Sequence, residues 1–303
     1  MAVFASGLDL PEGPYPLPDG RWLLVEMGVR TGRVTVVSAD GRAVSGLART
    51  GRPNAVVAER NGVLWVAESH PEPALLMVAD GTVGVAMTDC AGLPLLFPND
   101  LVFGPDGMLY LTDSGVLLDD WAPGGAIRAD YRTAPIDGRI FRIDTRSGAC
   151  EVVDRGIAFA NGIAVAPDGD LYANEMITGE VFRYPWDPVR ARYGPRESFA
   201  NVLLPDDAEL SFAGPDGMTF GADGRLFCTV YGGGRVAVVA PDGKVLPPIP
   251  TAGRLPTNVS FGPAGARRLF VTECELGQIE VFDLDTCSAQ RHDPEAALRA
   301  WSR

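Results

Sequence analysis

The chain has 303 residues, of which 46% are hydrophobic and 36 are glycine, and it carries a formal net charge of −13. This charge argues against an extended nucleic-acid-binding surface, and no apolar stretch approaches the roughly 18 residues of a membrane-spanning helix. We therefore expect no nucleic-acid or membrane partner. The length and the glycine content predict one β domain over residues 1–303. We expect a monomer or a weak homo-oligomer.

In chain order, the predicted elements repeat one unit six times. Each unit has an apolar run, a tight turn ending in glycine, a second apolar run and a third alternating run, which is the pattern of consecutive β-hairpins. Intervals of 41 to 62 residues between turns, with several strands in each, are typical of a propeller. The sequence predicts an all-β, six-bladed β-propeller closed around a central channel. The turn glycines are Gly20, Gly62, Gly107, Gly169, Gly224 and Gly265.

The two longest intervals predict insertions at residues 115–137 and 186–211. Long loops on a rigid scaffold often cover a functional site. The first insertion carries Trp121, Ile127 and Tyr131, which favours a lid over an apolar ligand. Long helices are not expected, and only residues 293–301 have helical spacing.

A polar residue stands eight positions before the turn glycine in five of the six units. Innermost strands line the channel, so residues at one register should converge at one channel mouth. Buried carboxylates are costly without a partner, and oxygen ligands suit a hard divalent cation. The alternative is that these side chains satisfy backbone groups and channel water. The five residues are Glu12, Asn54, Asn99, Asn161 and Asp216, with Asn258 offered at a shifted place in the sixth unit.

Four segments resemble the family of senescence marker protein, gluconolactonases and luciferin-regenerating enzyme. They read LPEGPYPLPDG, FPNDLVFGPDGMLYLTDSG, FANGIAVAPDG and GPDGMTFGADGRL, and the resemblance extends over roughly residues 8–288. It implies a propeller with a central metal site and a small-molecule substrate. By this resemblance Glu12, Asn161 and Asp216 bind the metal, Asp216 also acts as general base, and Asn99 contacts the substrate.

One position departs from the family pattern. Some sugar-lactone hydrolases of the family have an arginine two residues before this asparagine, whereas Phe97 stands there in this chain. A phenyl ring cannot bind a polyol as a guanidinium does. With Trp121 nearby in the expected lid, Phe97 predicts a substrate less polar than a simple sugar lactone.

These observations predict a metal-dependent hydrolase of a lactone or ester. The cation would act as a Lewis acid, Asp216 would take a proton from water, and Asn99 and Asn54 would bind the oxyanion or ring oxygens. Asp100, next to Asn99, could support the ligand-binding residues from behind, but adjacent strand residues point opposite ways, which favours a residue that braces the loop. The ligand set is compatible with Ca²⁺, Mn²⁺, Zn²⁺ or Fe²⁺. The alternative is a non-hydrolytic protein on this scaffold: an isomerase, cyclase or lyase of a specialised metabolite, or a ligand- or metal-binding propeller.

The remaining expectations concern location and structural side chains. The first 13 residues lack a charged leader and an apolar core, and the five cysteines show no zinc-like spacing. We expect reduced cysteines and residence in the cytoplasm. The acids that end second strands, Asp113, Glu175 and Glu273, are expected to be solvated, the alternative being that they face the site. His70 could reach the mouth from its loop.

Overall fold

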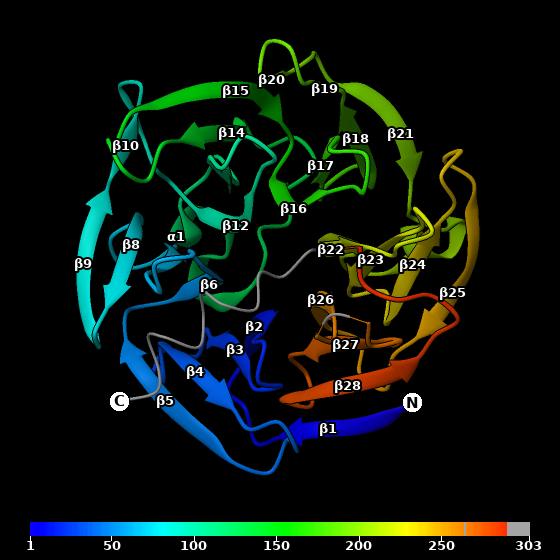
Figure 1. Ribbon diagram of the computed structural model, residues 1–303. Helices are drawn as coiled ribbons and strands as arrows, with labels where there is room; N and C mark the ends of the chain where they lie inside the picture. Colours follow the sequence, from blue (N-terminus) through cyan, green and yellow to red (C-terminus); the bar gives the residue numbers. More distant parts are fainter. Residues whose placement is uncertain (264, 290–303) are drawn as a thin grey trace.

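The predicted six-bladed propeller is confirmed by the computed structural model, which describes residues 1–263 and 265–289. Six four-stranded antiparallel sheets are arranged radially, and their innermost strands surround the central channel (Figure 1). From the channel outward, the first three blades are β2 (Pro11–Pro16), β3 (Trp22–Glu26), β4 (Arg33–Val37) and β5 (Val44–Arg49); β6 (Pro53–Ala58), β7 (Leu64–Glu68), β8 (Ala74–Ala79) and β9 (Thr82–Met87); and β12 (Pro98–Phe103), β13 (Leu109–Asp113), β14 (Gly138–Ile143) and β15 (Cys150–Ile157).

The last blade closes the ring with a strand from the beginning of the chain. Strand β1 pairs antiparallel with β28, so that Ala2 lies opposite Val281 and Ser6 opposite Gln278. The repeat pattern does not reveal this closure, because β1 precedes the first repeat. The last three blades are β16 (Ala160–Val165), β17 (Leu171–Glu175), β18 (Glu180–Tyr184) and β21 (Glu197–Asn201); β22 (Gly214–Phe220), β23 (Leu226–Tyr231), β24 (Arg235–Val239) and β25 (Val245–Pro250); and β26 (Pro256–Phe261), β27 (Arg268–Glu273), β28 (Gln278–Asp283) and β1 (Ala2–Ser6).

Each predicted turn glycine lies between the first and second strands of its blade. All six have a positive φ, from 75° at Gly107 to 98° at Gly169. Side chains with a Cβ rarely adopt this conformation, which explains why glycine recurs there. The hydrophobic core lies between adjacent blades. For example, Leu23 and Val25 of β3 pack with Leu64 and other apolar side chains of the second blade.

The two expected insertions have different structures. Residues 115–137 contain the short helix α1 (Leu118–Trp121) and the 3₁₀ helix η1 (Pro123–Gly125). Residues 186–211 contain a small hairpin of β19 (Trp186–Asp187) and β20 (Arg192–Tyr193), the 3₁₀ helix η2 (Pro205–Glu209), and β21, which is the outer strand of the fourth blade. Residues 293–301, with their helical spacing, lie outside the described residues. No helix in the described ranges is long and apolar enough to span a membrane.

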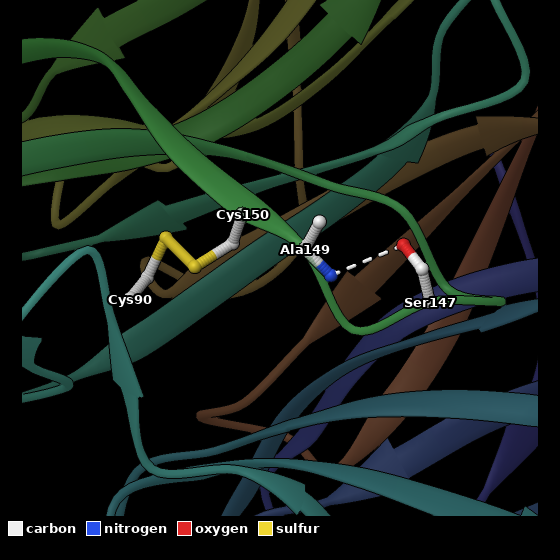
Figure 2. Close-up of a disulfide and its surroundings, with 4 residues drawn as sticks. All are labelled: Cys90, Ser147, Ala149 and Cys150. Atoms are coloured by element: carbon white, nitrogen blue, oxygen red, sulfur yellow. Dashed lines mark hydrogen bonds between the residues drawn. A yellow bond between two sulfur atoms is a disulfide. The ribbon is translucent and has the colours of Figure 1, made fainter.

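The expectation that all cysteines are reduced is wrong. Cys90 and Cys150 form a disulfide, with their Cα atoms 5.7 Å apart (Figure 2). Cys90 belongs to β10 (Asp89–Cys90), which pairs with β11 (Leu93–Pro94) in the connection between the second and third blades. Cys150 begins the outer strand of the third blade. The two residues are 60 positions apart, so only blade packing brings them together.

Candidate active site at the channel mouth

The five predicted polar residues occupy equivalent places at one end of the channel. We call this end the mouth, and we call Glu12, Asn54, Asn99, Asn161 and Asp216 the mouth ring. Each lies at the second or third position of an innermost strand. Their side chains are 3–8% exposed. The structure therefore places all five at the register that the repeats predict.

A β-bulge accompanies this register in every blade. Pairing between the first and second strands shifts at or next to the mouth-ring position in all six sheets. A bulge redirects side chains that would otherwise alternate between the two faces of a strand. The residue after the mouth-ring position can therefore also approach the site, which strict alternation would forbid.

Asp100 and Asn258 enter the site through these bulges. The Asp100 carboxylate accepts hydrogen bonds from the backbone of Leu101 (2.8 Å) and of Ile163 in the next blade (3.3 Å). Asn258 Nδ2 donates to Glu12 Oε1 at 2.9 Å. The expected bracing by Asp100 is seen in these backbone bonds, whereas the bulge also brings its carboxylate close enough to raise the pKa of Glu12 and Asp216.

Glycine at the corresponding bulge position of the fourth and fifth blades leaves room for close contact with the next blade, in the fifth blade with the Asn258 side chain. A Cβ on Gly217 would lie 1.9 Å from Asn258 Cγ, and one on Gly162 would lie 2.2 Å from the carbonyl oxygen of Asp216. Neither glycine has a positive φ, so close packing is the reason for glycine at both positions.

Three buried carboxylates interact at the mouth. Burial and the Asp216 carboxylate raise the pKa of Glu12 well above its ordinary value. Burial and the Asp100 carboxylate likewise raise the pKa of Asp216, against a hydrogen bond from Asn161. Burial raises the pKa of Asp100 to about 6. Such a cluster is unfavourable when fully ionised and would be stabilised by a bound cation.

Two oxygens in this cluster are available to a cation. Glu12 Oε2 and Asn161 Oδ1 are buried and accept no hydrogen bond in the structure. Within the described ranges, no three side chains of His, Cys, Asp or Glu converge as a ready ligand set. A metal at the mouth would therefore need an amide oxygen as well as carboxylates, which suits a hard divalent ion. The residues present fit such an ion.

The backbone beneath the ring is held by the preceding blade. Thr112 Oγ1 donates to the Asn161 carbonyl at 2.6 Å, and Asn174 Nδ2 donates to the Asp216 carbonyl at 2.6 Å. Thr257 Oγ1 donates to the Pro11 carbonyl at 2.8 Å, next to Glu12. These bonds run between blades, so the positions of the ring residues depend on closure of the propeller.

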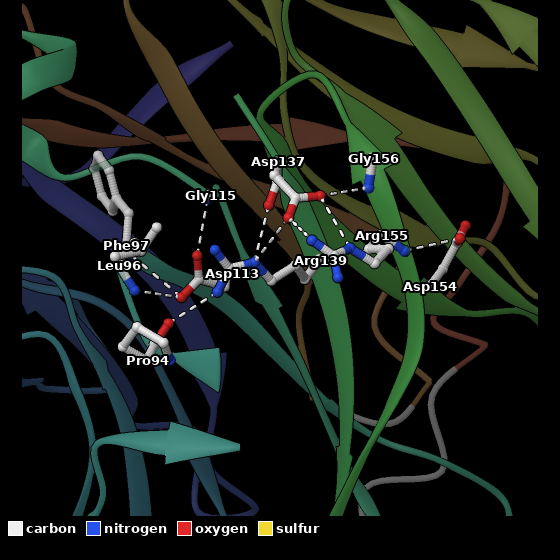
Figure 3. A network of polar contacts seen from close by, with 10 residues as sticks. All are labelled: Pro94, Leu96, Phe97, Asp113, Gly115, Asp137, Arg139, Asp154, Arg155 and Gly156. Carbon is white, nitrogen blue, oxygen red and sulfur yellow. Dashed lines mark hydrogen bonds and ion pairs between the residues drawn. The ribbon is translucent and has the colours of Figure 1, made fainter. Parts of the chain in front are cut away.

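The expectation that the acids at the ends of the second strands are solvated is wrong. They accept hydrogen bonds from the backbone just before the innermost strand of the same blade, and Asp113 and Glu273 are fully buried. Asp113 accepts from Leu96 at 2.7 Å and Phe97 at 3.3 Å (Figure 3). Glu175 accepts from Ala158 at 2.6 Å and Glu273 from Leu255 at 2.9 Å. Glu26 and Glu68 act in the same way on Asp9 and on Gly51 and Arg52.

The first insertion packs aromatic side chains against the mouth. The Trp121 ring lies 4.3 Å from that of Phe159 and 5.8 Å from that of Phe212, measured between centroids. Phe97 contacts Phe159 edge-on at 5.6 Å. Together with Tyr131 these residues form one buried apolar cluster, which we call the aromatic cap. Phe97 and Trp121 are thus brought together through Phe159.

The other candidate side chains lie at the edge of this arrangement. Asn99 Nδ2 donates to Ser114 Oγ at 3.0 Å. Asn54 Oδ1 accepts from Ser69 Oγ at 3.1 Å and from Arg52 Nη1 at 3.0 Å. His70 Nε2 lies 3.6 Å from Asp119 Oδ1 of the insertion, and His292 lies outside the described residues.

Arg52 is the residue at this site that sequence reasoning missed. It stands two positions before Asn54, as Phe97 stands two positions before Asn99. Its guanidinium carbon lies 5.7 Å from the centroid of the Phe97 ring in the next blade. Comparing the residue two positions before the mouth-ring residue in all six repeats, and not only in the third, would have identified Arg52.

Fold and site together define a six-bladed propeller with a buried carboxylate–amide cluster at one channel mouth and an aromatic cap beside it. Residues 10–275 match the model of the SMP-30/Gluconolactonase/LRE-like region. The chain belongs to this family, as its motifs predict.

Curated relatives include two lactonases. A gluconolactonase from Zymomonas mobilis subsp. mobilis is 26% identical over 291 residues, covering 90% of this chain and 78% of the relative. A 6-deoxy-6-sulfogluconolactonase from Pseudomonas putida is 33% identical over 136 residues. This second match covers 45% of the chain and less than half of the relative, 44% of its length.

Solved structures share the fold at low sequence identity. A gluconolactonase from Xanthomonas campestris superposes with a TM-score of 0.74 at 24% identity, covering 93% of this chain and 88% of that one. The calcium-binding protein regucalcin from Agrobacterium tumefaciens gives 0.74 at 19% identity, with coverage of 97% and 96%. These matches support the propeller architecture.

Proposed function

We propose that the protein is a divalent-metal-dependent hydrolase of lactones. The observation that carries this proposal is the pair of unpartnered oxygens, Glu12 Oε2 and Asn161 Oδ1, beside the Asp216 carboxylate. Membership of a family with lactonase relatives supports the same reaction class.

In this mechanism Glu12, Asn161 and Asp216 would hold the cation, which would be Ca²⁺, Mn²⁺, Zn²⁺ or Fe²⁺. When bound, the cation supplies Lewis acidity to the lactone carbonyl. Asp216 takes a proton from the attacking water. Asn99 and Asn54 would donate to the developing oxyanion or to the ring oxygens.

We further propose a substrate less polar than a simple sugar lactone. The support for this is the buried aromatic cluster of Phe97, Phe159 and Trp121 beside the mouth. Burial of an apolar substituent against such rings contributes about 25 cal/mol per Å². Membership of this enzyme family supports a small-molecule substrate. A monomer or weak homo-oligomer stays a prediction.

Residence in the cytoplasm also stays a prediction. Its premise of five reduced cysteines does not hold, because Cys90 and Cys150 are paired. Disulfides persist mainly in oxidising compartments.

The test is removal of metal with a chelator, followed by addition of each cation in turn. Hydrolysis of glucono-1,5-lactone and of a panel of alkyl and aryl lactones is followed by pH-stat, and metal binding by calorimetry and thermal unfolding. We expect activity to return with a divalent ion and E12Q to weaken binding of that ion. The matched control is E209Q, at an exposed glutamate at the end of η2.

Unchanged activity after full metal removal would overturn metal dependence. Binding of metal without hydrolysis of any lactone would favour the non-hydrolytic alternative. A tenfold or greater preference for gluconolactone would overturn the less polar substrate.

A further inference from the structure

Arg52 is a half-buried cation at the mouth whose guanidinium feels the charges of Glu68 and Glu12 without making a direct ion pair with either. Nη1 donates to Asn54 Oδ1 at 3.0 Å and to Ser69 Oγ at 3.2 Å. Within the part of the chain that the structure describes, the guanidinium makes no ion pair, and Nε and Nη2 donate to no side chain or carbonyl. An arginine presents five donors in a rigid fork, so one edge of this guanidinium is free to bind a ligand.

The backbone of Arg52 is fixed in place. Its amide N–H and that of Gly51 donate to the buried Glu68 carboxylate. This is the same arrangement that Asp113 makes with Phe97 in the next blade. Arg52 and Phe97 therefore hold equivalent positions, one blade apart, and the guanidinium reaches over the Phe97 ring at 5.7 Å.

Arg52 also lies within electrostatic range of the reactive carboxylates. Its positive charge lowers the pKa of Asp216, although burial and Asp100 raise that pKa overall. Burial in turn lowers the pKa of the Arg52 guanidinium. A ligand anion at this point would gain a charge-assisted hydrogen bond in a partly desolvated setting.

Three arginines cluster at the mouth end of the outer two strands of the first blade, although the whole chain is acidic. Strand registers place Arg33 and Arg49 at the mouth end of the first blade, opposite each other. With Arg30 they line a hollow of about 300 Å³. Arg33 is paired with Glu26, whereas Arg30 and Arg49 are exposed. Such a cluster attracts anions toward the mouth.

We propose that Arg52 is a specificity-determining residue that binds a carboxylate on the lactone substrate. The substrate would then combine an apolar part against the aromatic cap with one anionic group at the Arg52 fork. This inference rests on the proposed lactonase function and narrows its substrate class to lactones that carry one carboxylate and an apolar part in place of the several hydroxyls of a sugar lactone.

The test compares two substrates that differ by one charge: a γ-butyrolactone carrying a ring carboxylate, and the same ring carrying the isosteric carboxamide. We expect the metal-loaded wild type to prefer the carboxylate. R52Q should lower kcat/KM for the carboxylate lactone by about 10- to 100-fold, mainly through KM, and change the carboxamide value little. The kcat/KM of R52K for the carboxylate lactone should fall between those of wild type and R52Q, because lysine keeps the positive charge and lacks the forked donors of arginine.

The matched control is R225Q. Arg225 also lies 5.7 Å from an aromatic centroid, that of Phe227, but it stands beside the Gly224 turn at the opposite end of the fifth blade. R225Q should leave the carboxylate-to-carboxamide ratio unchanged. If R52Q lowers both substrates equally, Arg52 only supports Asn54 and the inference is overturned.

A binding measurement separates this inference from the proposed function. The ring-opened dicarboxylate, 2-hydroxyglutarate, should raise the Tm of wild type more than 4-hydroxybutyrate does, and R52Q should abolish the difference. If no lactone is hydrolysed, the proposed function fails and the Tm difference still decides on Arg52. If lactones are hydrolysed but neither the carboxylate-to-carboxamide ratio of kcat/KM nor the Tm difference depends on Arg52, the inference alone fails.

Discussion

At the scale of single residues, the site concentrates buried carboxylates that Arg52 compensates only in part. Glu12, Asp100 and Asp216 are buried together, and each has a raised pKa. Glu12 Oε2 and Asn161 Oδ1 are left without partners. Structures seldom leave buried polar atoms unsatisfied without a functional reason. Chemistry and cation binding are therefore expected to depend on the same few side chains.

Asp216→Asn should abolish turnover while largely preserving the fold. The amide keeps the size and one ligand oxygen but cannot accept the proton from water. Loss of a general base typically lowers the rate by about 10²–10⁴. The measurement is kcat at saturating metal, with Tm as the check on folding. Wild-type turnover in this variant would remove Asp216 from the mechanism.

Asp100 should make the metal-free protein less stable as pH rises. The folded pKa of about 6 exceeds the ordinary value near 3.9, so the folded state binds the proton more tightly. The stabilisation is present below pH 4 and is lost as pH rises through about 6. Relative to D100N, wild type should lose up to about 3 kcal/mol between these limits.

The free energy of unfolding, measured by denaturant titration in chelator across this pH range, tests the sign. The pH-independent part of the difference in unfolding free energy between wild type and D100N reflects other effects of the substitution. The change of that difference with pH is therefore the relevant quantity. A slope that is flat or reversed would show that Asp100 is not protonated in the folded state.

At the scale of elements, the bulge at the start of each innermost strand decides which side chains reach the mouth. In the third and sixth blades the bulge admits Asp100 and Asn258. In the fourth and fifth blades glycine occupies the equivalent place, and the space is filled by a neighbour. The repeated units therefore share a backbone form while contributing different chemistry.

Gly217→Ala should disturb the site from the neighbouring blade. The new Cβ would overlap Asn258, which donates to Glu12. Overpacking of this kind costs about 1–3 kcal/mol, and metal affinity should fall with it. The matched control is G84A, since a Cβ on Gly84 of β9 meets only Met77 Cε at 4.0 Å. Equal effects of both changes on metal affinity would contradict this reading.

At the scale of the whole molecule, ring closure supports the site. The backbone carbonyls of the mouth residues are held by side chains of the preceding blade, and Thr257 of the last blade binds Pro11 of the first. The last blade is itself completed by β1. Loosening β1 should therefore weaken both global stability and the geometry at Glu12.

Phe4→Ala should lower stability by about 2 kcal/mol. Phe4 of β1 packs edge-on against Phe270 at 5.0 Å and against Trp22 of the first blade, and large-to-small changes at packed positions cost a few kcal/mol. The control is V3A in the same strand, where Val3 is 51% exposed. Denaturant titration measures both. Equal stability of the two variants would show that β1 does not close the ring.

The sequence by itself determined the repeat, the six turns and the register of the mouth ring. Turn glycines with positive φ and the alternation of strand residues are local properties, so a single sequence is enough to predict them. The tertiary structure alone decided the rest. The β1 closure, the Cys90–Cys150 pair, the inward turn of Asp100 and the reach of Arg52 over Phe97 each join segments from different blades or depend on a bulge. Such contacts arise from how the blades pack together, which no local pattern of residues records.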